Sequence, residues 1–323
     1  RAAADEHRGG GAADCRGRGD RGNLSAMDHS AFLKTLPPDT KARLTARSDR
    51  AGLVHLAGHL GLIGGAASLI ASGVPFWPLL LPVLGILLVF LFTLEHEATH
   101  QTPFRSERLN EVVGSLCGLV LILPFTWFRY FHLAHHRFTN DPEHDPELAA
   151  PKPETWAAWV WHVSGLPYWG AMLRQLVVNA LGRAEATYLP ARAQARIVAE
   201  ARWMLAAYAL ALGSLLVSDL VLWLWVVPML LGQPFLRLYL LAEHGRCPAV
   251  ANMFENTRTT FTNRAVRFLA WNMPYHIEHH AYPAVPFHHL PELHRLAKAH
   301  LVTTAPGYVA FTKAYTGAFG ERH

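Results

Sequence analysis

Long apolar runs separated by polar loops dominate the chain. Residues 53–73 and 76–94 form two such runs around a short turn near residues 72–75, and residues 203–236 form a longer one with Asp219 near its middle. A helix that crosses a bilayer needs about 20 mostly apolar residues. The first two runs therefore predict one spanning helix each, and 203–236 predicts two helices that turn near Asp219. The first of these two is short unless it begins before Arg202, and the pattern predicts four spans in two hairpins.

Two further apolar stretches are less suited to crossing a membrane. Residues 112–128 are only about 17 in number, and residues 156–182 are interrupted by His162, Pro167 and Arg174. Histidines cluster on both sides of these stretches, so a full crossing would place the clusters in opposite compartments. We therefore expect interfacial or re-entrant segments here.

Composition and charge also point to a membrane. Hydrophobic residues make up 51% of the chain and charged residues 16%, against about 25% charged in soluble proteins. The net charge is +5, and the Arg and Lys residues lie beside apolar segments, which favours binding to a membrane surface over binding to nucleic acid. Neither predicted hairpin turn carries Lys or Arg, whereas the other loops carry many. By the positive-inside rule, both termini and all large loops are expected to be cytoplasmic.

The first 26 residues differ from the rest. They are rich in Gly, Ala, Arg and Asp and show no periodicity, so we expect residues 1–26 to be a disordered low-complexity extension. Their GxGxxG motif (Gly17, Gly19, Gly22) follows no predicted strand, which argues against a dinucleotide site. The three cysteines form no CxxC pair, which fits a reducing compartment.

Three histidine clusters are the candidates for a metal-binding site. They read HEATH at residues 96–100, HLAHH at 132–136 and HIEHH at 276–280. On a helix, positions i, i+3 and i+4 share one face, so each cluster points its imidazoles in one direction. Neutral imidazole binds first-row metals. Eight histidines exceed the three or four that one zinc ion takes, so two metal ions are the economical explanation. The eight are His96, His100, His132, His135, His136, His276, His279 and His280.

Two other functions compete with this interpretation. The first cluster matches HExxH, the motif of zinc proteases, in which Glu97 would act as general base. That hypothesis leaves the other two clusters unexplained, and the chain has no Asp-Gly pair to supply the third ligand expected of an intramembrane protease. A metal transporter without redox turnover would place its histidines along a path within the spans. Here they gather at span ends and in loops.

At this point the sequence resembles the membrane fatty acid desaturase superfamily, the histidine-box di-iron enzymes. The resemblance covers roughly residues 50–300 and rests on the box order HxxxH, HxxHH, HxxHH, together with the flanks HHRFTNDP after box two and NMPYH before box three. It implies an all-α membrane domain over residues 27–323. We expect four spans, interfacial helices and a cytoplasmic histidine-rich cap that holds two irons.

The resemblance also implies a ninth ligand just after the fourth span, for which His244 is the matching residue. Some members hold a metal-bound water with an Asn one turn earlier, where this chain has Leu240. Ligating imidazoles need acceptors that fix their orientation. We expect Glu97, Asp141 and Glu278 in this role, ahead of Asp145 and Glu243. No other catalytic residue is assigned.

The implied reaction uses O2 and two electrons to oxidise an apolar chain. We favour desaturation of a lipid acyl chain, with a hydroxylase or ketolase on the same scaffold as the alternative. The sequence has no HPGG heme motif, so we expect a separate electron donor of the ferredoxin, rubredoxin or cytochrome b5 type. The basic cytoplasmic face, including Arg258 and Arg264, could dock an acidic donor. Short loops suggest a bacterial enzyme of the inner membrane.

Overall fold

A computed structural model describes residues 27–320 of the chain, so the prediction for residues 1–26 lies outside the described residues. The described part is almost entirely helical, and its one small sheet pairs two short strands in parallel, Thr259 with Thr304 and Thr260 with Ala305. The helices and strands are α1 (His29–Thr35), α2 (Pro38–Leu44), α3 (Asp49–Ala71), η1 (Trp77–Leu80), α4 (Leu81–Val89), α5 (Leu91–Thr99), α6 (Glu107–Leu121), α7 (Phe125–Phe138), η2 (Pro146–Ala149), α8 (Trp156–Val163), α9 (Leu166–Ala180), η3 (Ala191–Ala193), α10 (Gln194–Ser214), η4 (Leu222–Val226), α11 (Val227–His244), α12 (Met253–Asn256), β1 (Thr259–Thr260), α13 (Arg264–Leu269), α14 (His276–Ala281), α15 (Leu290–Ala297), β2 (Thr304–Ala305) and α16 (Tyr308–Gly317).

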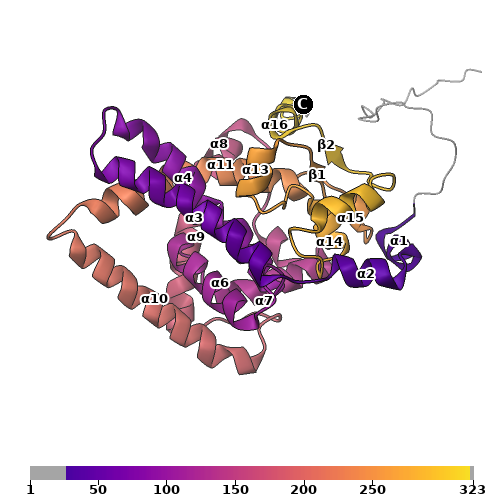
Figure 1. The fold of residues 1–323 in the computed structure, drawn as a ribbon, viewed down its shortest axis with the longest axis horizontal. Coiled ribbons are helices and arrows are strands. Elements are labelled where there is room, and N and C mark those ends of the chain that lie inside the picture. Colours follow the sequence, from indigo (N-terminus) through magenta and orange to yellow (C-terminus); the bar gives the residue numbers. More distant parts are fainter. Residues whose placement is uncertain (1–26, 321–323) are drawn as a thin grey trace, which may run out of the picture.

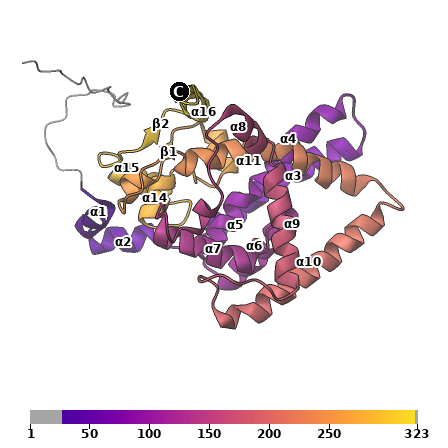
Figure 2. The ribbon, with the colours of Figure 1, turned by 180° about the vertical axis from the view of Figure 1, so that it is seen from behind.

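Two helical hairpins extend from a compact body that holds the C-terminal elements (Figure 1). In the first, α3 leads away from the body and α4–α5 returns; in the second, α10 leads away and α11 returns. The breaks fall at residues 72–76 and 215–221, where the sequence predicted turns. Figure 2 shows the same two hairpins from behind, with α9 packed across α10.

Three helical segments are long and apolar enough to cross a membrane: Pro38–Ala71, Trp77–Thr99 and Leu222–His244. The bent pair α6 and α7 passes the same test of length and composition when it is counted as one span. α10 begins before Arg202, an extension that the short first half of 203–236 needs to reach a spanning length. However, α10 also contains Arg196, Glu200 and Arg202. These charges explain why α10 does not qualify on composition, although it pairs with α11 in the second hairpin.

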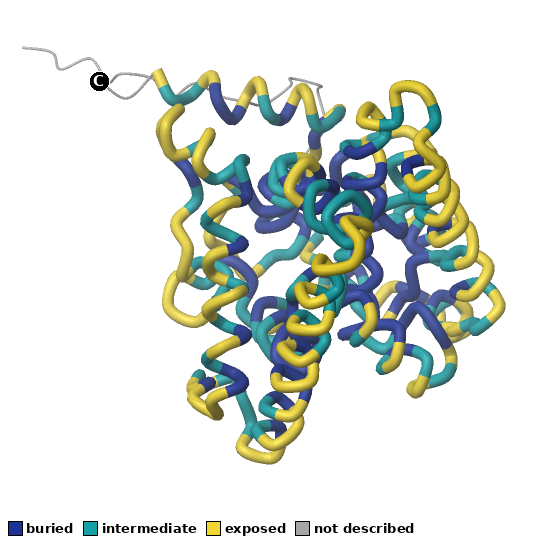
Figure 3. The backbone as a smooth tube through the Cα atoms, turned by 90° about the vertical axis from the view of Figure 1, so that its left-hand side faces the viewer, coloured by how far each residue is buried: buried dark blue, intermediate teal, exposed yellow. Residues whose placement is uncertain are grey.

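The outer faces of these helices suit a lipid environment. Along α3, Leu53, Val54, Leu60, Leu62 and Leu69 are all exposed. Figure 3 shows exposed positions following the outer sides of the helices while buried positions face inward. An apolar helix that leaves such a face uncovered is typical of a bilayer neighbour rather than of water.

The stretch that contains residues 112–128 folds back on itself. Ile122 adopts a left-handed conformation with φ of 58° at the end of α6, and α7 starts after Pro124 at an angle of 99° to α6. His100 before the stretch and His132 after it are in contact, with their Nε2 atoms 2.9 Å apart. The two ends of the segment therefore lie close together, as the ends of a re-entrant segment do. α8 and α9 are not among the candidate spans of the described chain.

Two glycines set the closest helix crossing. A Cβ atom on Gly85 of α4 would lie 2.1 Å from Pro228 O, and one on Gly232 of α11 would lie 2.3 Å from Gly85 O. Only hydrogen fits at these positions, so the backbones of α4 and α11 touch. This contact sets α5, which continues from α4, beside the end of α11. By contrast, a Cβ on Gly61, Gly64 or Gly65 of α3 would meet nothing within 4 Å, so helix packing within the described chain does not require these three glycines.

Candidate metal centre

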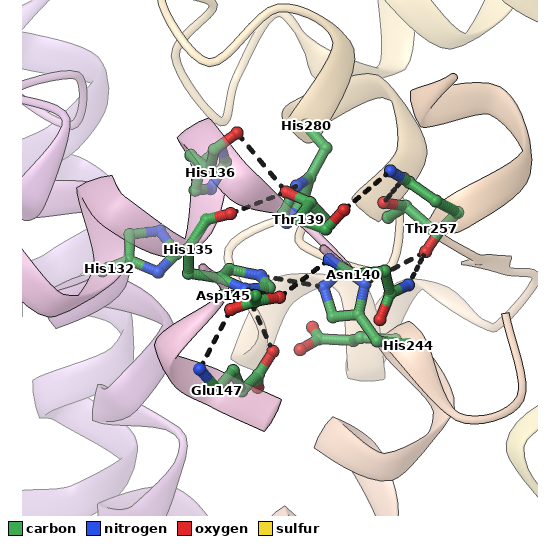
Figure 4. Close-up of polar contacts among 12 residues, drawn as sticks. His132, His135, His136, Thr139, Asn140, Asp145, Glu147, His244, Thr257 and His280 are labelled. Carbon is green, nitrogen blue, oxygen red and sulfur yellow. Dashed lines mark hydrogen bonds and ion pairs between the residues drawn. The ribbon is translucent and has the colours of Figure 1, made fainter. Parts of the chain in front are cut away.

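The nine predicted histidines come from four helices and meet in one buried cluster. His96 lies in the last turn of α5 and His100 directly follows that helix, whereas His244 is the last residue of α11. α7 contributes three histidines and α14 the other three, in both cases at positions i, i+3 and i+4. Figure 4 shows His132, His135 and His136 of α7 beside His244 and His280.

The ring nitrogens form two groups that each suit a metal ion. In the first group, five imidazoles each offer one nitrogen, and these five nitrogens lie within 4.8 Å of one another. In the second group, three imidazoles do the same. The groups are His96, His100, His132, His136 and His279, and His135, His244 and His280. His276 adjoins the second group, because its Nε2 lies 3.1 Å from His244 Nε2.

Many of these nitrogens have no hydrogen-bond partner in the described structure. Both ring nitrogens of His136 and His279 are buried without one, as are His96 Nδ1 and His280 Nε2. A buried polar atom without a partner costs about 1–3 kcal/mol. Several at one place, all of them nitrogens that can ligate, indicate a site built for cations. The donor set fits two first-row metal ions with imidazole ligands.

Burial keeps the imidazoles in the ligating form. Desolvation lowers the pKa of His279 from 6.5 to about 3, and proximity to His135 adds to the effect. Burial likewise holds the pKa of His276 and of His280 well below 6.5, reinforced by their neighbouring histidines. These three rings are therefore neutral at pH 7, which leaves a lone pair available for a metal.

Acceptors outside the cluster orient several rings. The Nδ1–H of His135 donates to Asp145 Oδ1 at 2.9 Å, and Glu147 Oε2 lies 3.3 Å away. His280 Nδ1 lies 3.2 Å from Thr139 Oγ1, and His244 Nδ1 lies 3.4 Å from Asn256 O. Such contacts fix the tautomer and direct Nε2 toward the metal.

The five acidic candidates take different places. Glu97 Oε1 lies 3.3 Å from His279 Nδ1, and Glu243 Oε1 lies 3.4 Å from His276 Nδ1. Glu278 instead contacts His294 and accepts a hydrogen bond from Thr259 Oγ1, so it joins α14 to α15 and β1. Asp141 does not reach the cluster: its carboxylate is 41% exposed and pairs with His144. Asp145, which we ranked lower, occupies the place that we expected Asp141 to take.

Several histidines outside the nine have structural contacts. His55 and His59 contact the carbonyls of Phe268 and Leu87. His294 is not a surface residue, because its side chain is only 12% exposed and contacts Glu278. Thr139 and Asn256, which the sequence did not single out, have ordinary polar side chains, and only the fold brings them to the rings.

The structure corrects the docking hypothesis for Arg258. Its side chain is buried, its Nη1 donates to the carbonyls of Ala242 and Gly245 at 2.8 Å each, and its guanidinium stacks on Phe311. Arg258 therefore ties the end of α11 to α16 and is not available to a partner. Arg264 is exposed.

The orienting contacts give a specific prediction. Replacing Asp145 with Asn should weaken metal binding by about 10- to 100-fold, because His135 loses the charged acceptor that holds its ring. The matched control is Asp141→Asn, four residues away and exposed, which should leave metal affinity within about twofold. Metal content after dialysis against graded chelator measures both. Equal losses in the two variants would contradict the assignment of Asp145.

Comparison with known proteins decides the family. Residues 72–312 match the family model described as fatty acid desaturase, which covers more than half of the chain. The chain belongs to the fatty acid desaturase family. This confirms the resemblance drawn from the histidine boxes, and it makes the chain a membrane protein and a lipid oxidoreductase of that family.

Relatives in this family are similar over most of their length. A sphingolipid delta(4)-desaturase of Drosophila melanogaster is 28% identical over 71% of this chain and 68% of its own. A dihydrorhizobitoxine desaturase of Bradyrhizobium elkanii is 28% identical over 83% of this chain and 80% of its own. A beta-carotene 4-ketolase of Haematococcus lacustris is 26% identical over 75% of this chain and 68% of its own. The substrates in these names differ widely, so similarity does not select one for this desaturase-family chain.

Proposed function

We propose that this chain is a membrane di-iron oxidoreductase that uses O2 and two electrons from a separate donor to desaturate a lipid acyl chain. The observation that carries the proposal is the convergence of nine buried or partly buried imidazoles from four helices into two adjoining groups. Family membership supports the reaction class.

The two groups divide the ligands between two irons. His96, His100, His132, His136 and His279 would hold one ion, and His135, His244, His276 and His280 would hold the other. When bound, the irons would supply the oxidising power needed to remove hydrogen from an unactivated C–H bond. Imidazole survives such an oxidant, whereas thiolates are themselves oxidised. Both described cysteines, Cys117 and Cys247, lie outside the two groups.

The protein contributes orientation and exclusion of water. Glu97 is fully buried, and its Oε2 accepts from Thr102 Oγ1 and from Phe287 N while Oε1 faces His279. It thereby links α5 to α14 and to the loop between α14 and α15. A rigid, dry site of this kind keeps electrons and reactive intermediates away from bulk water.

We further propose that the termini and the centre face the cytoplasm, in a bacterial inner membrane, with α10 and α11 as the third and fourth spans. The lack of Lys and Arg at both hairpin tips supports this orientation. A pocket of about 340 Å³ opens beside Thr139 and Asn256, the residues that contact His280 and His244. It is a suitable place for a ferredoxin, rubredoxin or cytochrome b5 type of donor to approach the metals.

Hydroxylation or ketone formation is the second candidate, and the ketolase relative supports it. The protease and transport hypotheses have less support. Glu97 faces His279 and Thr102 and so is not free to activate a water, and the histidines form a closed cluster rather than a path.

The reaction class can be tested with purified protein in lipid nanodiscs, supplied with ferredoxin, its reductase and NADPH. We expect O2 uptake that depends on added lipid, and a product two mass units lighter than its substrate. A product sixteen units heavier would replace desaturation with hydroxylation. Lipid hydrolysis or no O2 uptake by iron-loaded protein with several donors would contradict the proposal.

A further inference from the structure

Two polar side chains in the candidate span Leu222–His244 have buried atoms that make no hydrogen bond. Gln233 and Arg237 stand one turn apart on α11, so they share a face of the helix. Gln233 is completely buried, and neither its amide nitrogen nor its amide oxygen makes a hydrogen bond. The Nε and Nη2 atoms of Arg237 are also buried without a partner. Polar groups at membrane depth are costly, and their presence commonly marks a substrate path.

This polar face meets the start of α9. A Cβ on Gly165, the residue that caps α9, would lie 2.3 Å from Gln233 Cγ, so the two helices are in direct contact there. One turn later, the guanidinium of Arg237 lies 4.1 Å from the ring centre of Tyr168. Trp169, next to Tyr168, has a buried indole N–H that also lacks an acceptor.

The available groups favour one kind of ligand. Nε–H and one Nη2–H form a single edge of the guanidinium, and that edge matches the two oxygens of a carboxylate. The Gln233 amide nitrogen adds a further donor, and the amino end of α9 adds partial positive charge. Glu147 and Glu243 are close enough to interact with Arg237 electrostatically, but they lie against His135 and His276, and neither bonds to the free guanidinium edge.

The position suits a substrate of the metal centre. Arg237 precedes His244 by seven residues on α11, which is about 10 Å along the axis. The neighbouring surface of α8 and α9 exposes Val160, Trp161 and Leu166, an apolar surface from which a chain could enter.

We propose that Gln233, Arg237 and the start of α9 form a carboxylate-binding site, and that the substrate is an apolar chain with a free carboxylate rather than an esterified lipid. This deepens the proposed function and rests on it for the oxidation step, but the binding site itself does not require turnover. The Arg237 edge is the positioning element, since a carboxylate held there sets which carbons lie near the histidine cluster.

The test measures equilibrium binding of radiolabelled oleate to the purified, metal-loaded chain in nanodiscs, with methyl oleate and phosphatidate as competitors. We expect methyl oleate to compete at least about tenfold more weakly than unlabelled oleate, because the ester loses a charge-assisted pair of hydrogen bonds. Arg237→Gln should abolish this preference, and Arg237→Lys should restore only part of it because lysine lacks the planar edge. Arg174→Gln, an exposed arginine farther along α9, is the matched control and should bind oleate as the wild type does.

Equal competition by oleate and methyl oleate in the wild type, or an unchanged preference in Arg237→Gln, would overturn the proposal. Tighter Arg237-dependent binding of phosphatidate would overturn the carboxylate assignment in favour of a phosphate. If Arg237→Gln does not fold, two other measurements decide the matter. One is the competition in the wild type, and the other is Gln233→Met, which should selectively weaken the binding of oleate. Arg237-dependent oleate binding without O2 uptake would leave this site standing and reject the proposed function instead.

Discussion

Replacing His244 with Ala should remove one of two irons and lower turnover by more than about 100-fold. His244 is the only one of the nine outside the three boxes, and its Nε2 lies within 3.2 Å of the Nε2 atoms of both His135 and His276. Loss of an ordinary orienting residue costs about 10- to 100-fold in metal affinity or activity, and loss of a ligand should cost more. Metal analysis and O2 uptake on the same preparation measure both effects.

His144→Ala is the control for this variant. His144 lies in the same region of the sequence as box two, but its side chain is 56% exposed, pairs with Asp141 and stacks on Phe138, away from the two histidine groups. We expect two irons and full activity from it. Two retained irons in His244→Ala would remove His244 from the ligand set.

Gly232→Ala should destabilise the protein and disturb the metal centre together. Its new methyl group would lie 2.3 Å from Gly85 O, which is backbone and cannot move aside. α11 must then separate from α4, and this movement shifts His244 relative to His135 and His276, which it contacts. Overpacking usually costs about 1–3 kcal/mol, and a backbone collision should lie at the upper end. Thermal unfolding and iron content should both fall.

Gly61→Ala provides the matched substitution on α3, because a Cβ there meets nothing within 4 Å. Alanine favours a helix interior over glycine by about 0.5–1 kcal/mol, so this variant should be at least as stable as the wild type. Equal melting temperatures for Gly61→Ala and Gly232→Ala would contradict the tight crossing of α4 and α11.

The histidine cluster was predictable because its signal is local. Each box places its imidazoles on one helix face, and the apolar runs already indicate which ends of the helices lie together. The turns of both hairpins and the folding back of residues 112–128 follow from the same two patterns. The family model then confirmed the resemblance that the boxes carry.

The orienting residues were less predictable because they depend on loop geometry. After box two, Asn140 adopts a left-handed conformation, and its N–H donates to Asp145 Oδ2 at 2.8 Å. This bend turns Asp145 toward His135. Asp141 accepts instead from the N–H of Glu143 and points outward. Both aspartates follow box two closely, so spacing alone could not separate them.

The helix α10 shows a different limit. The apolar run predicted a helix from Trp203 onward. α10 instead starts at Gln194 and includes charged residues, which lower its mean hydropathy. Among these, Glu200 is buried and accepts from Thr126 N, and Arg196 pairs with Glu111. Those partners come from α6 and α7, so only the tertiary fold explains why the charges are tolerated.

Metal stoichiometry of the purified wild-type chain tests the central claim most directly. Element analysis together with Mössbauer spectroscopy of ⁵⁷Fe-enriched protein should give about two irons per chain in nitrogen-rich sites. One zinc per chain, kept when His135 and His279 are both replaced by Ala but lost with His96→Ala, would contradict a di-iron centre built from nine histidines.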